Sequence, residues 1–426
     1  MSSDWPHVKL GSLADFQEGY VNPSQREPSY FDGPVKWLRA TDLNDGLVTN
    51  TSRTLSDKGF NSAGKSAVLF EPGTLAISKS GTIGRLGLLG DHMCGNRAVI
   101  NIKPKPNSVP RYLFFVLRHL RPTIETLAEG SVQKNLYVST LSKLDVPAPS
   151  KGLQQAIADM LGVLDDRITL LRETNTTLEA IAQALFKSWF VDFDPVYAKM
   201  QGRAPEGMNE ATATLFPDSF EESELGPVPK GWSTISFRDS INVIGGGTPK
   251  TSVPEYWGGD IPWFSVVDAP GAFDVFVVDT EKHITEAGLN GSSTKLLPVG
   301  TTIISARGTV GRLALTGCPM AMNQSCYGLR GKAGDQYFTY LSTTQLVEQL
   351  KQRAHGSVFD TITQETFAGV SIFYPSVELI GAFERLVEPL MLRIRENLMQ
   401  VNSLASMRNT LLPRLISGQL SLGDVD

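Results

Sequence analysis

Two stretches of this chain carry nearly the same sequence, LFEPGTLAISKSGTIGRLG at residues 69–87 and LLPVGTTIISARGTVGRLA at residues 296–314. Further equivalent positions share a glycine, arginine, tryptophan or proline: Gly81 and Gly308, Arg85 and Arg312, Trp5 and Trp232, Pro149 and Pro375. The repeat covers about 150 residues, far more than the roughly 20–50 residues of a solenoid unit. It therefore indicates a duplicated domain, and two diverged copies are expected to contact two related but different targets.

Composition and length place the chain among globular proteins. Its 426 residues are 41% hydrophobic and 19% charged, which suits two or three domains. No apolar run approaches the roughly 18–20 residues that cross a bilayer. Residues 1–10 lack the features of a signal peptide, and the three cysteines show no CxxC spacing. We therefore expect a cytoplasmic protein with reduced cysteines.

The net charge of −5 is unevenly distributed. Residues 1–152 hold 18 basic and 13 acidic side chains, whereas residues 153–230 hold 6 and 13. The acidity is concentrated between the copies, so it does not exclude a polyanionic ligand for the copies themselves. Because phosphate neutralisation supplies much of the affinity for nucleic acid, binding by this chain alone should be weak.

Each copy begins with about 150 residues rich in Gly, Pro and short β-type runs, and ends in a long heptad pattern. Residues 68–70, 75–77 and 98–102 are predicted as strands, and a helix is predicted near residues 110–120. The fold class that follows is α+β: two repeated mixed α/β domains joined by two long antiparallel coiled-coil helices, with pseudo-twofold symmetry. The predicted boundaries are 1–150 for the first domain, 151–193 for the first long helix, 194–230 for a linker, 231–376 for the second domain, and 377–426 for the second long helix and a tail.

The heptad pattern indicates two helices packed along each other. Ser150 and Ser376 are the expected N-caps. The residues predicted to pair the helices are Leu164, Leu171, Asn175, Leu178, Leu390, Asn397 and Leu404. A buried asparagine in such a seam costs stability but specifies register. A pseudo-twofold axis near residue 173 would bring Asn175 opposite Asn397, so we predict that these two side chains hydrogen-bond.

No complete catalytic motif is present in the sequence. Residues 59–66, GFNSAGKS, match the phosphate-loop pattern, but the strand and helix that such a loop requires are not predicted around them. Residues 194–197, DPVY, resemble an amino-methyltransferase motif without its second proline. The five histidines have no metal-ligand spacing. These observations favour a binding protein over an enzyme.

Polar and basic residues on the glycine-rich turns are the candidate DNA ligands, because Arg and Lys pair with guanine and Asn and Gln pair with adenine. The candidates are Lys79, Arg85, Arg97, Gln133, Lys134, Asn135, Arg307, Arg312, Asn323 and Gln324. Arg85 and Arg312 are common to both copies, so we expect them to hold phosphate or position the turn. Lys79 and Arg307 differ between the copies and are better candidates for reading bases.

Over nearly its whole length, the sequence resembles the specificity subunit of type I DNA restriction–modification systems. The resemblance rests on the turns GTIGR at 81–85 and GTVGR at 308–312, on GSVQKNLYVSTLSKLDVPAP at 130–149, on residues 153–195, and on LGPVPKGW at 225–232. The start of the second long helix, YPSVEL at 374–379, departs from the typical pattern.

The resemblance implies a non-catalytic, bacterial or archaeal DNA-binding protein. Each α/β domain would be a target-recognition domain that reads one half of a bipartite, asymmetric site in double-stranded DNA. The helices would set the spacing and dock two methyltransferase subunits, and motor-nuclease subunits would also join. No cofactor or metal is expected in this chain, since S-adenosylmethionine, ATP and Mg would bind the partner subunits. The alternatives are a self-contained methyltransferase or nuclease with duplicated recognition domains, and a purely structural coiled-coil scaffold.

Overall fold

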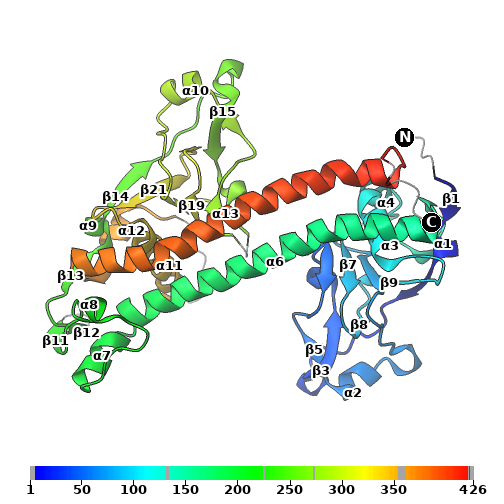
Figure 1. The fold of residues 1–426 in the computed structure, drawn as a ribbon, viewed down its shortest axis with the longest axis horizontal. Helices are drawn as coiled ribbons and strands as arrows, with labels where there is room; N and C mark the ends of the chain where they lie inside the picture. The colour runs from blue at the N-terminus through cyan, green and yellow to red at the C-terminus, as the bar shows by residue number, and fades with distance from the viewer. Residues whose placement is uncertain are drawn as a thin grey trace. The chain divides into compact units, whose positions relative to one another are not determined.

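The computed structural model describes residues 5–130, 134–223, 226–271, 274–353, 361–420 and residue 422. The chain forms two compact units. Unit 1 comprises Met1–Ile168 and Ser403–Asp426, and unit 2 comprises Thr169–Asn402. Two helices of 40 residues, α6 (Lys151–Phe190) and α13 (Val377–Ile416), each begin in one unit and end in the other (Figure 1).

Unit 1 contains a five-stranded sheet in the order β2-β9-β6-β7-β4. Its strands are β2 (Ala14–Glu18), β9 (Val99–Pro104), β6 (Leu75–Ser78), β7 (Leu86–Leu89) and β4 (Gly46–Val48). All neighbours are antiparallel except β4 and β7, which are parallel. The prediction of a strand at 75–77 is confirmed. The prediction at 68–70 is wrong: only Phe70 makes a β-bridge, to Met93, and the turn at Pro72-Gly73 follows at once.

A smaller sheet of unit 1 has the order β5-β3-β8. Its strands are β5 (Thr54–Leu55), β3 (Phe31–Leu38) and β8 (Met93–Gly95), and β1 (His7–Lys9) pairs separately with β10 (Asp145–Pro147). The helices of unit 1 outside α6 and α13 are α1 (Leu10–Leu13), α2 (Asp57–Asn61), α3 (Pro110–His119), α4 (Arg121–Thr126) and α5 (Val138–Leu141). Helix α3 confirms the predicted helix near 110–120.

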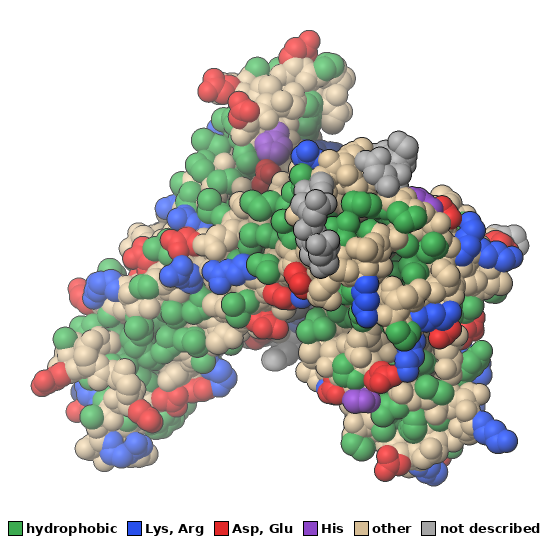
Figure 2. All heavy atoms as spheres, turned by 45° about the vertical axis from the view of Figure 1, so that its right-hand side comes forward, with side chains coloured by type: hydrophobic (Ala, Val, Ile, Leu, Met, Phe, Trp, Pro, Cys, Tyr) green, Lys and Arg blue, Asp and Glu red, His purple; other side chains and the backbone are tan. Residues whose placement is uncertain are grey.

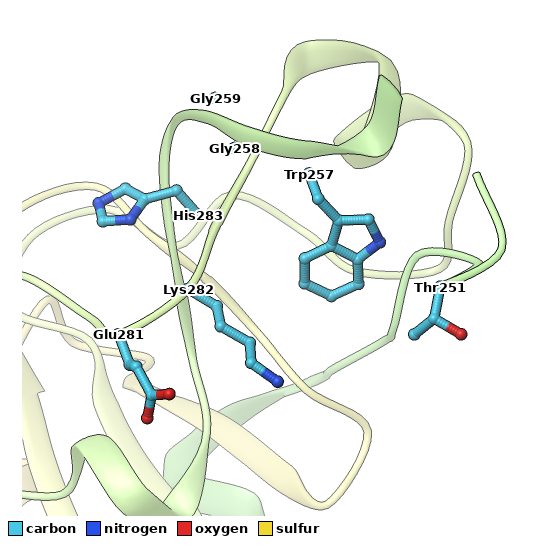
Figure 3. Close-up of a pocket in the computed structure, with 7 residues that line it drawn as sticks. All are labelled: Thr251, Trp257, Gly258, Gly259, Glu281, Lys282 and His283. Carbon is cyan, nitrogen blue, oxygen red and sulfur yellow. The ribbon is translucent and has the colours of Figure 1, made fainter. Parts of the chain in front are cut away.

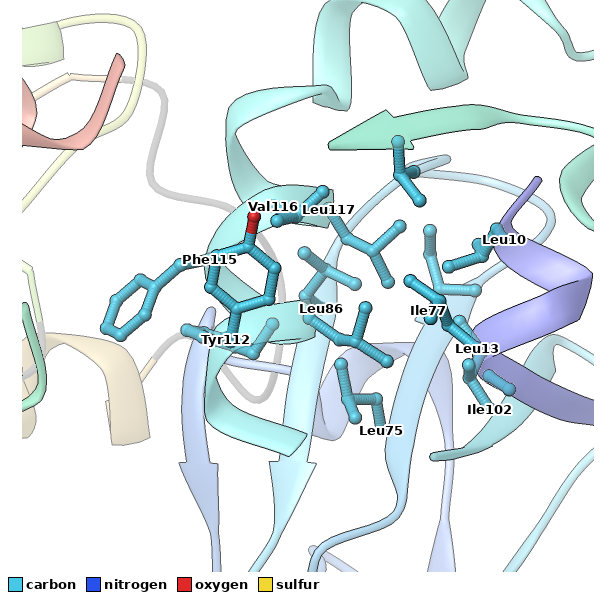
Figure 4. Packing of buried hydrophobic residues seen from close by; sticks show 14 of the residues in the cluster. Leu10, Leu13, Leu75, Ile77, Leu86, Ile102, Tyr112, Phe115, Val116 and Leu117 are labelled. Atoms are coloured by element: carbon cyan, nitrogen blue, oxygen red, sulfur yellow. The ribbon is translucent and has the colours of Figure 1, made fainter. Parts of the chain in front are cut away.

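The core of unit 1 lies between α3 and the five-stranded sheet. Tyr112 and Leu117 of α3 lie beside a layer of sheet residues that includes Leu75, Ile77, Leu86 and Ile102, whereas the ring of Phe115 points away from that layer (Figure 4). These side chains are almost completely buried. All four residues of β6 and the first four of β9 are buried, so these strands are recognisable in the sequence as short continuous apolar runs between turns.

Unit 2 repeats the topology of unit 1. Its five-stranded sheet has the order β14-β21-β18-β19-β16, and its small sheet has the order β17-β15-β20. The strands are β14 (Ile241–Gly245), β21 (Cys326–Gly331), β18 (Thr302–Ser305), β19 (Leu313–Thr316), β16 (Phe276–Val277), β17 (His283–Ile284), β15 (Trp257–Phe264) and β20 (Ala321–Met322), while β13 (Ser233–Ser236) pairs with β22 (Ser371–Tyr374). The duplicated mixed α/β domain predicted from the sequence is thereby confirmed.

The helices of unit 2 outside α6 and α13 are α7 (Asp194–Met200), α8 (Glu210–Ala213), α9 (Phe237–Ser240), α10 (Glu286–Asn290), α11 (Gln336–Arg353) and α12 (Gln364–Ala368). Residues 194–230, expected to be a linker, contain α7, α8 and a hairpin of β11 (Phe220–Ser223) and β12 (Gly226–Pro229). Helix α11 is held to α13 by Glu384, whose carboxylate accepts the N–H groups of Tyr337 at 2.9 Å and Phe338 at 2.7 Å.

The two long helices pack against each other as predicted. In unit 2, Phe186 and Phe190 of α6 make edge-on ring contacts with Phe383 of α13. Asn397 Nδ2 donates to Asn175 Oδ1 at 2.8 Å, and both side chains are buried. The predicted hydrogen bond between the two asparagines is confirmed. Among the other predicted pairing residues, Leu171 is buried, and Leu164, Leu178, Leu390 and Leu404 are half-buried. The predicted caps are present: Ser376 Oγ accepts the Leu379 N–H at 3.2 Å, and Ser150 Oγ accepts that of Leu153 at 3.4 Å.

In unit 1 the helices meet through charge as well as apolar contact. Asp165 of α6 accepts from Arg118 of α3 at 3.1 Å and from Arg408 of α13 at 2.6 Å. Leu412, Leu415 and Ile416 of α13 join the core formed by α3 and the sheet. Trp5 Nε1 also donates to the Leu415 carbonyl at 3.2 Å. Residues from both ends of the sequence are therefore integral to one core.

Candidate nucleic-acid interface

The glycine-rich turn between β6 and β7 is built by a serine and two glycines. Ser78 Oγ accepts the Arg85 N–H at 2.9 Å and donates to the Thr82 carbonyl. Gly81 and Gly84 adopt φ values of 74° and 84°, in the left-handed region that favours glycine. The glycines of the repeated motif are thus explained by backbone geometry.

The same turn recurs between β18 and β19. Ser305 Oγ accepts the Arg312 N–H at 2.8 Å and donates to the Thr309 carbonyl at 2.5 Å. Gly308 and Gly311 have φ values of 76° and 80°. The two units therefore present an identical framework, on which side chains that differ between the copies can carry different specificities.

The shared arginines lie on these turns in different surroundings. Arg85 is half-buried, and its guanidinium makes no hydrogen bond or ion pair with another described residue. Arg312 is exposed, and its Nη2 donates to the Pro270 carbonyl at 3.0 Å. The contact of Arg312 ties the turn to a neighbouring loop, which fits the expected positioning role.

Lys79 is held by an ion pair. Its Nζ lies 2.6 Å from Glu18 Oε2 at the end of β2, and both side chains are partly buried. In unit 2 the equivalent positions are Ala306 and Gly245, so the whole pair is replaced there. Lys79 would have to leave Glu18 to reach a base. The ion pair favours a supporting role, and base reading by Lys79 stays a prediction.

Arg97 and Gln324 occupy equivalent exposed positions in the turn before β9 and β21. In each turn the preceding asparagine holds the backbone in place. Asn96 Oδ1 accepts the Ala98 N–H, and Asn323 Oδ1 accepts the Ser325 N–H, each at 3.0 Å. Gln324 Oε1 also accepts the Thr248 hydroxyl. Arg97 is therefore the freer of the two side chains, because no described residue bonds to its guanidinium.

The remaining candidates lie on segments that cross the same region. Arg307 is exposed, and its backbone forms a bridge with Thr361. Asn135 forms the equivalent kind of bridge with Glu129, and the exposed Lys134 precedes it. Gln133 lies outside the described residues.

The structure brings most of these candidates to one end of the five-stranded sheet in each unit. In unit 1 this end comprises the end of β2, the end of β6 and the start of β9, where Glu18 is opposite Ile100 and Ser78 is opposite Val99. The N–H of Leu136 donates to the Lys79 carbonyl at 2.9 Å and brings the segment of Lys134 and Asn135 there. Loops that lie side by side at one end of a sheet are a common location for recognition residues.

One exposed residue at this edge was missed by the sequence analysis. Tyr20 is 47% exposed and lies between Gly19 and Val21, which bond to the carbonyls of Val99 and Gly95. In unit 2 the equivalent segment is Gly246-Gly247, one residue shorter, so Tyr20 has no counterpart. The sequence does carry a sign of this insertion. Trp5 and Trp232 are 227 residues apart, whereas Trp37 and Trp263 are 226 residues apart, so one residue is extra in the first copy between them.

The described ranges hold no group of three or more His, Cys, Asp or Glu residues that could ligate a metal ion. Residues 59–66 form the end of α2 and a short 3-10 turn at Gly64–Ser66, a geometry unlike a strand–loop–helix phosphate site. None of the described helices is long and apolar enough to cross a membrane.

Comparisons with known proteins agree with this architecture. The family model described as type I restriction modification DNA specificity domain matches residues 2–180 and again residues 229–379. The type I restriction enzyme HindI specificity subunit of Haemophilus influenzae is 31% identical over 75% of this chain and 79% of its own length. The type I restriction enzyme MjaIX specificity subunit of Methanocaldococcus jannaschii is 24% identical over 99% of this chain and 95% of its own.

The crystal structure of a type I restriction–modification S subunit from M. genitalium shares the fold. Its TM-score is 0.58 at 17% sequence identity, and the alignment covers 97% of this chain and 96% of that one. The family model matches both copies of the repeat and more than half of the chain. This chain therefore belongs to the type I restriction–modification DNA specificity family.

Proposed function

We propose that each unit reads one half of a bipartite, asymmetric DNA site. The reading surface consists of the loops at one end of the five-stranded sheet, where the turns of Ser78 and Ser305 lie, and is called the loop edge here. The observation that supports this most strongly is the contrast between a shared framework and different side chains. Ser78 and Ser305 build the same turn, whereas Lys79 is replaced by Ala306 and Arg97 by Gln324. Two domains with one backbone and different edge residues suit two different base sequences.

The chain acts in this proposal as the non-catalytic specificity subunit of a cytoplasmic complex. Two methyltransferase subunits dock on the long helices and supply S-adenosylmethionine chemistry, and motor-nuclease subunits supply ATP- and Mg-dependent cleavage. Exposed apolar side chains on both helices support a docking role, since large exposed apolar groups mark interaction surfaces. They include Val163 at 68% exposure and Leu170 at 52% on α6, and Met399 and Met407 on α13.

Exchange of one domain tests the proposal. Residues 231–376 are replaced by the corresponding domain of a relative, and the methylated sites of a host that expresses the hybrid are mapped by methylome sequencing. One half of the recognised site should change while the other half and the spacer, set by the 40-residue helices, stay constant. If both halves change, the units do not read DNA independently.

A second measurement separates this function from a self-contained methyltransferase or nuclease. The full chain, purified alone, is titrated with S-adenosylmethionine in a calorimeter and incubated with DNA and Mg²⁺. Neither cofactor binding nor cleavage is expected until the partner subunits are added. Binding of S-adenosylmethionine to the chain alone would favour the enzyme.

A further inference from the structure

A pocket lies in the small-sheet lobe of unit 2, formed around β15 and β17. It has a volume of about 530 Å³ and is lined by Thr251, Trp257, Gly258, Gly259, Glu281, Lys282 and His283. Figure 3 shows the indole of Trp257, the ammonium end of Lys282 and Thr251 around one space, with Glu281 and His283 on the other side of the strand. Trp257 is half-buried and rests edge-on against Trp263 at 5.2 Å between ring centres.

The repeat shows what the same space holds in unit 1. Trp257 is opposite Ile284 as Phe31 is opposite Leu55, so the two aromatic residues are equivalent. In unit 1 the guanidinium carbon of Arg53 lies 4.0 Å from the centre of the Phe31 ring. Arg53 Nη1 also donates to Gln25 Oε1 at 2.6 Å. A cation therefore covers this aromatic ring within the fold itself.

In unit 2 the aromatic ring is an indole, and no cation of the described residues lies over it. Lys282 stands where unit 1 has Arg53, and Thr251 stands where it has Gln25. No described residue forms an ion pair, hydrogen bond or ring contact with the Lys282 ammonium, and Lys282 is exposed. The indole ring of Trp257 attracts a cation more strongly than the phenyl ring of Phe31 does.

Charge on the surrounding lobe favours a cationic ligand over a nucleic acid. Residues 250–290 contain seven acidic side chains and two lysines, whereas the equivalent residues 24–61 contain five of each sign. In Figure 2 the acidic side chains at the top of the view lie on this lobe. His283 is engaged with Asp279 at 2.9 Å, and Glu281 replaces Ser52 of unit 1 beside the pocket.

We propose that the Trp257 pocket binds an arginine side chain of a partner protein, with the guanidinium on the indole face. The guanidinium takes the place that Arg53 holds in unit 1, and the acidic lobe supplies long-range attraction. Lys282 opposes this binding by like-charge repulsion and limits its strength. The site is independent of the loop edge assigned to DNA, so its failure would leave the DNA-reading proposal untouched.

The test uses the full chain with ¹⁵N-labelled tryptophan and three small probes. The probes are L-argininamide, the neutral isostere L-citrulline amide, and deoxyadenosine monophosphate. The chain has six tryptophans, and the indole signal of Trp257 is identified by its loss in Trp257→Phe. Argininamide should shift the Trp257 signal and leave Trp37 unaffected, and citrulline amide should bind at least tenfold more weakly.

Two variants test how the charge at position 282 and a cover over the indole change the affinity for argininamide. Lys282→Met removes a positive charge, so argininamide should bind about threefold more tightly, as expected for an exposed charge a few ångströms away. The double variant Lys282→Arg, Thr251→Gln recreates the Arg53–Gln25 cover of unit 1 and should weaken argininamide at least tenfold. Trp263 touches Trp257 and is expected to respond with it, so unchanged indole signals of Trp5, Trp37, Trp189 and Trp232 control for folding.

Three outcomes would overturn the proposal. Equal binding of argininamide and citrulline amide would mean that the charge is irrelevant. Binding of deoxyadenosine monophosphate that Lys282→Met weakens would assign the pocket to a nucleotide. Undiminished binding of argininamide by the double variant would place the ligand elsewhere on the lobe.

Discussion

Replacement of the paired asparagines tests how the long helices are held in register. Asn175 and Asn397 are 1% and 3% exposed. Asn175 Oδ1 accepts from Asn397, and Asn175 Nδ2 donates to the Ile394 carbonyl at 3.2 Å. Asn397→Leu leaves the Asn175 oxygen buried without its donor. The free energy of opening the helix pair at this point should fall by about 1–3 kcal/mol, which is the desolvation cost of one unsatisfied neutral group.

The double variant Asn175→Leu, Asn397→Leu should be less destabilised than the sum of the single variants. Both amides disappear together and leave two apolar side chains in an apolar seam, which can be close to neutral. The coupling free energy in a double-mutant cycle should therefore be about 1–3 kcal/mol. Amide hydrogen exchange of α6 around residue 175 measures it, because local opening free energies do not require two-state unfolding of the whole chain.

Asn402→Leu provides a matched control for this cycle. Asn402 lies on α13 and is exposed, so its replacement should change the opening free energy by less than about 0.5 kcal/mol. Additive losses in the double variant would refute the reasoning, since additivity would show that the two asparagines do not depend on each other.

Three further variants test other contacts. Asp165→Asn should cost about 3 kcal/mol in a urea titration, because the partly buried Arg118 and Arg408 lose their shared carboxylate; an unchanged midpoint would show that the ion pairs contribute nothing. Burial raises the pKa of Glu384 from 4.5 to about 7, so its contribution to stability is full below pH 4.5 and is lost as pH rises through 7. Glu384→Gln should therefore flatten the decline of the urea midpoint between pH 5 and 8, and an equally steep decline would contradict the burial argument. Arg307→Ala should make the free energy of DNA binding less favourable by about 1–3 kcal/mol through one base position of the site, whereas Arg312→Ala should weaken the binding of all DNA sequences alike. Affinities measured across single-base variants of the site would contradict this separation of roles if both variants lost the same affinity on every sequence.

Much of the fold was predictable because the repeat and the heptads are strong signals. The repeated SGTIGR-type turn located the two domains, and the asparagines in the helix seam predicted a specific hydrogen bond that the structure contains. The prediction of a strand at residues 68–70 is wrong because an apolar triplet before a Pro-Gly turn resembles a strand whether or not a neighbouring strand is available to pair with it.

The candidate site was less predictable than the fold. Residue type and motif position identified Lys79, but its ion pair with Glu18 joins residues 61 positions apart and leaves no local pattern. Tyr20 was missed because a one-residue insertion is visible only once strand pairings fix the alignment of the copies. The Trp257 pocket depends on the absence of a covering arginine, which becomes apparent only beside the covered ring of Phe31.

The sharing of α6 and α13 between the units has a consequence for how the protein is made. Residues Leu412, Leu415 and Ile416 belong to the core of unit 1, yet the ribosome adds them only after all of unit 2. At a translation rate of roughly 5–20 residues per second, the apolar side chains of Leu161 and Tyr112 lack these packing partners for about 10–60 s. Unit 2, whose residues are contiguous, is free to fold first. The nascent first domain is thus a candidate client for chaperones, and a stalled or nicked chain that lacks residues 403–416 should be recognised by cellular proteases rather than persist as a half-active DNA reader.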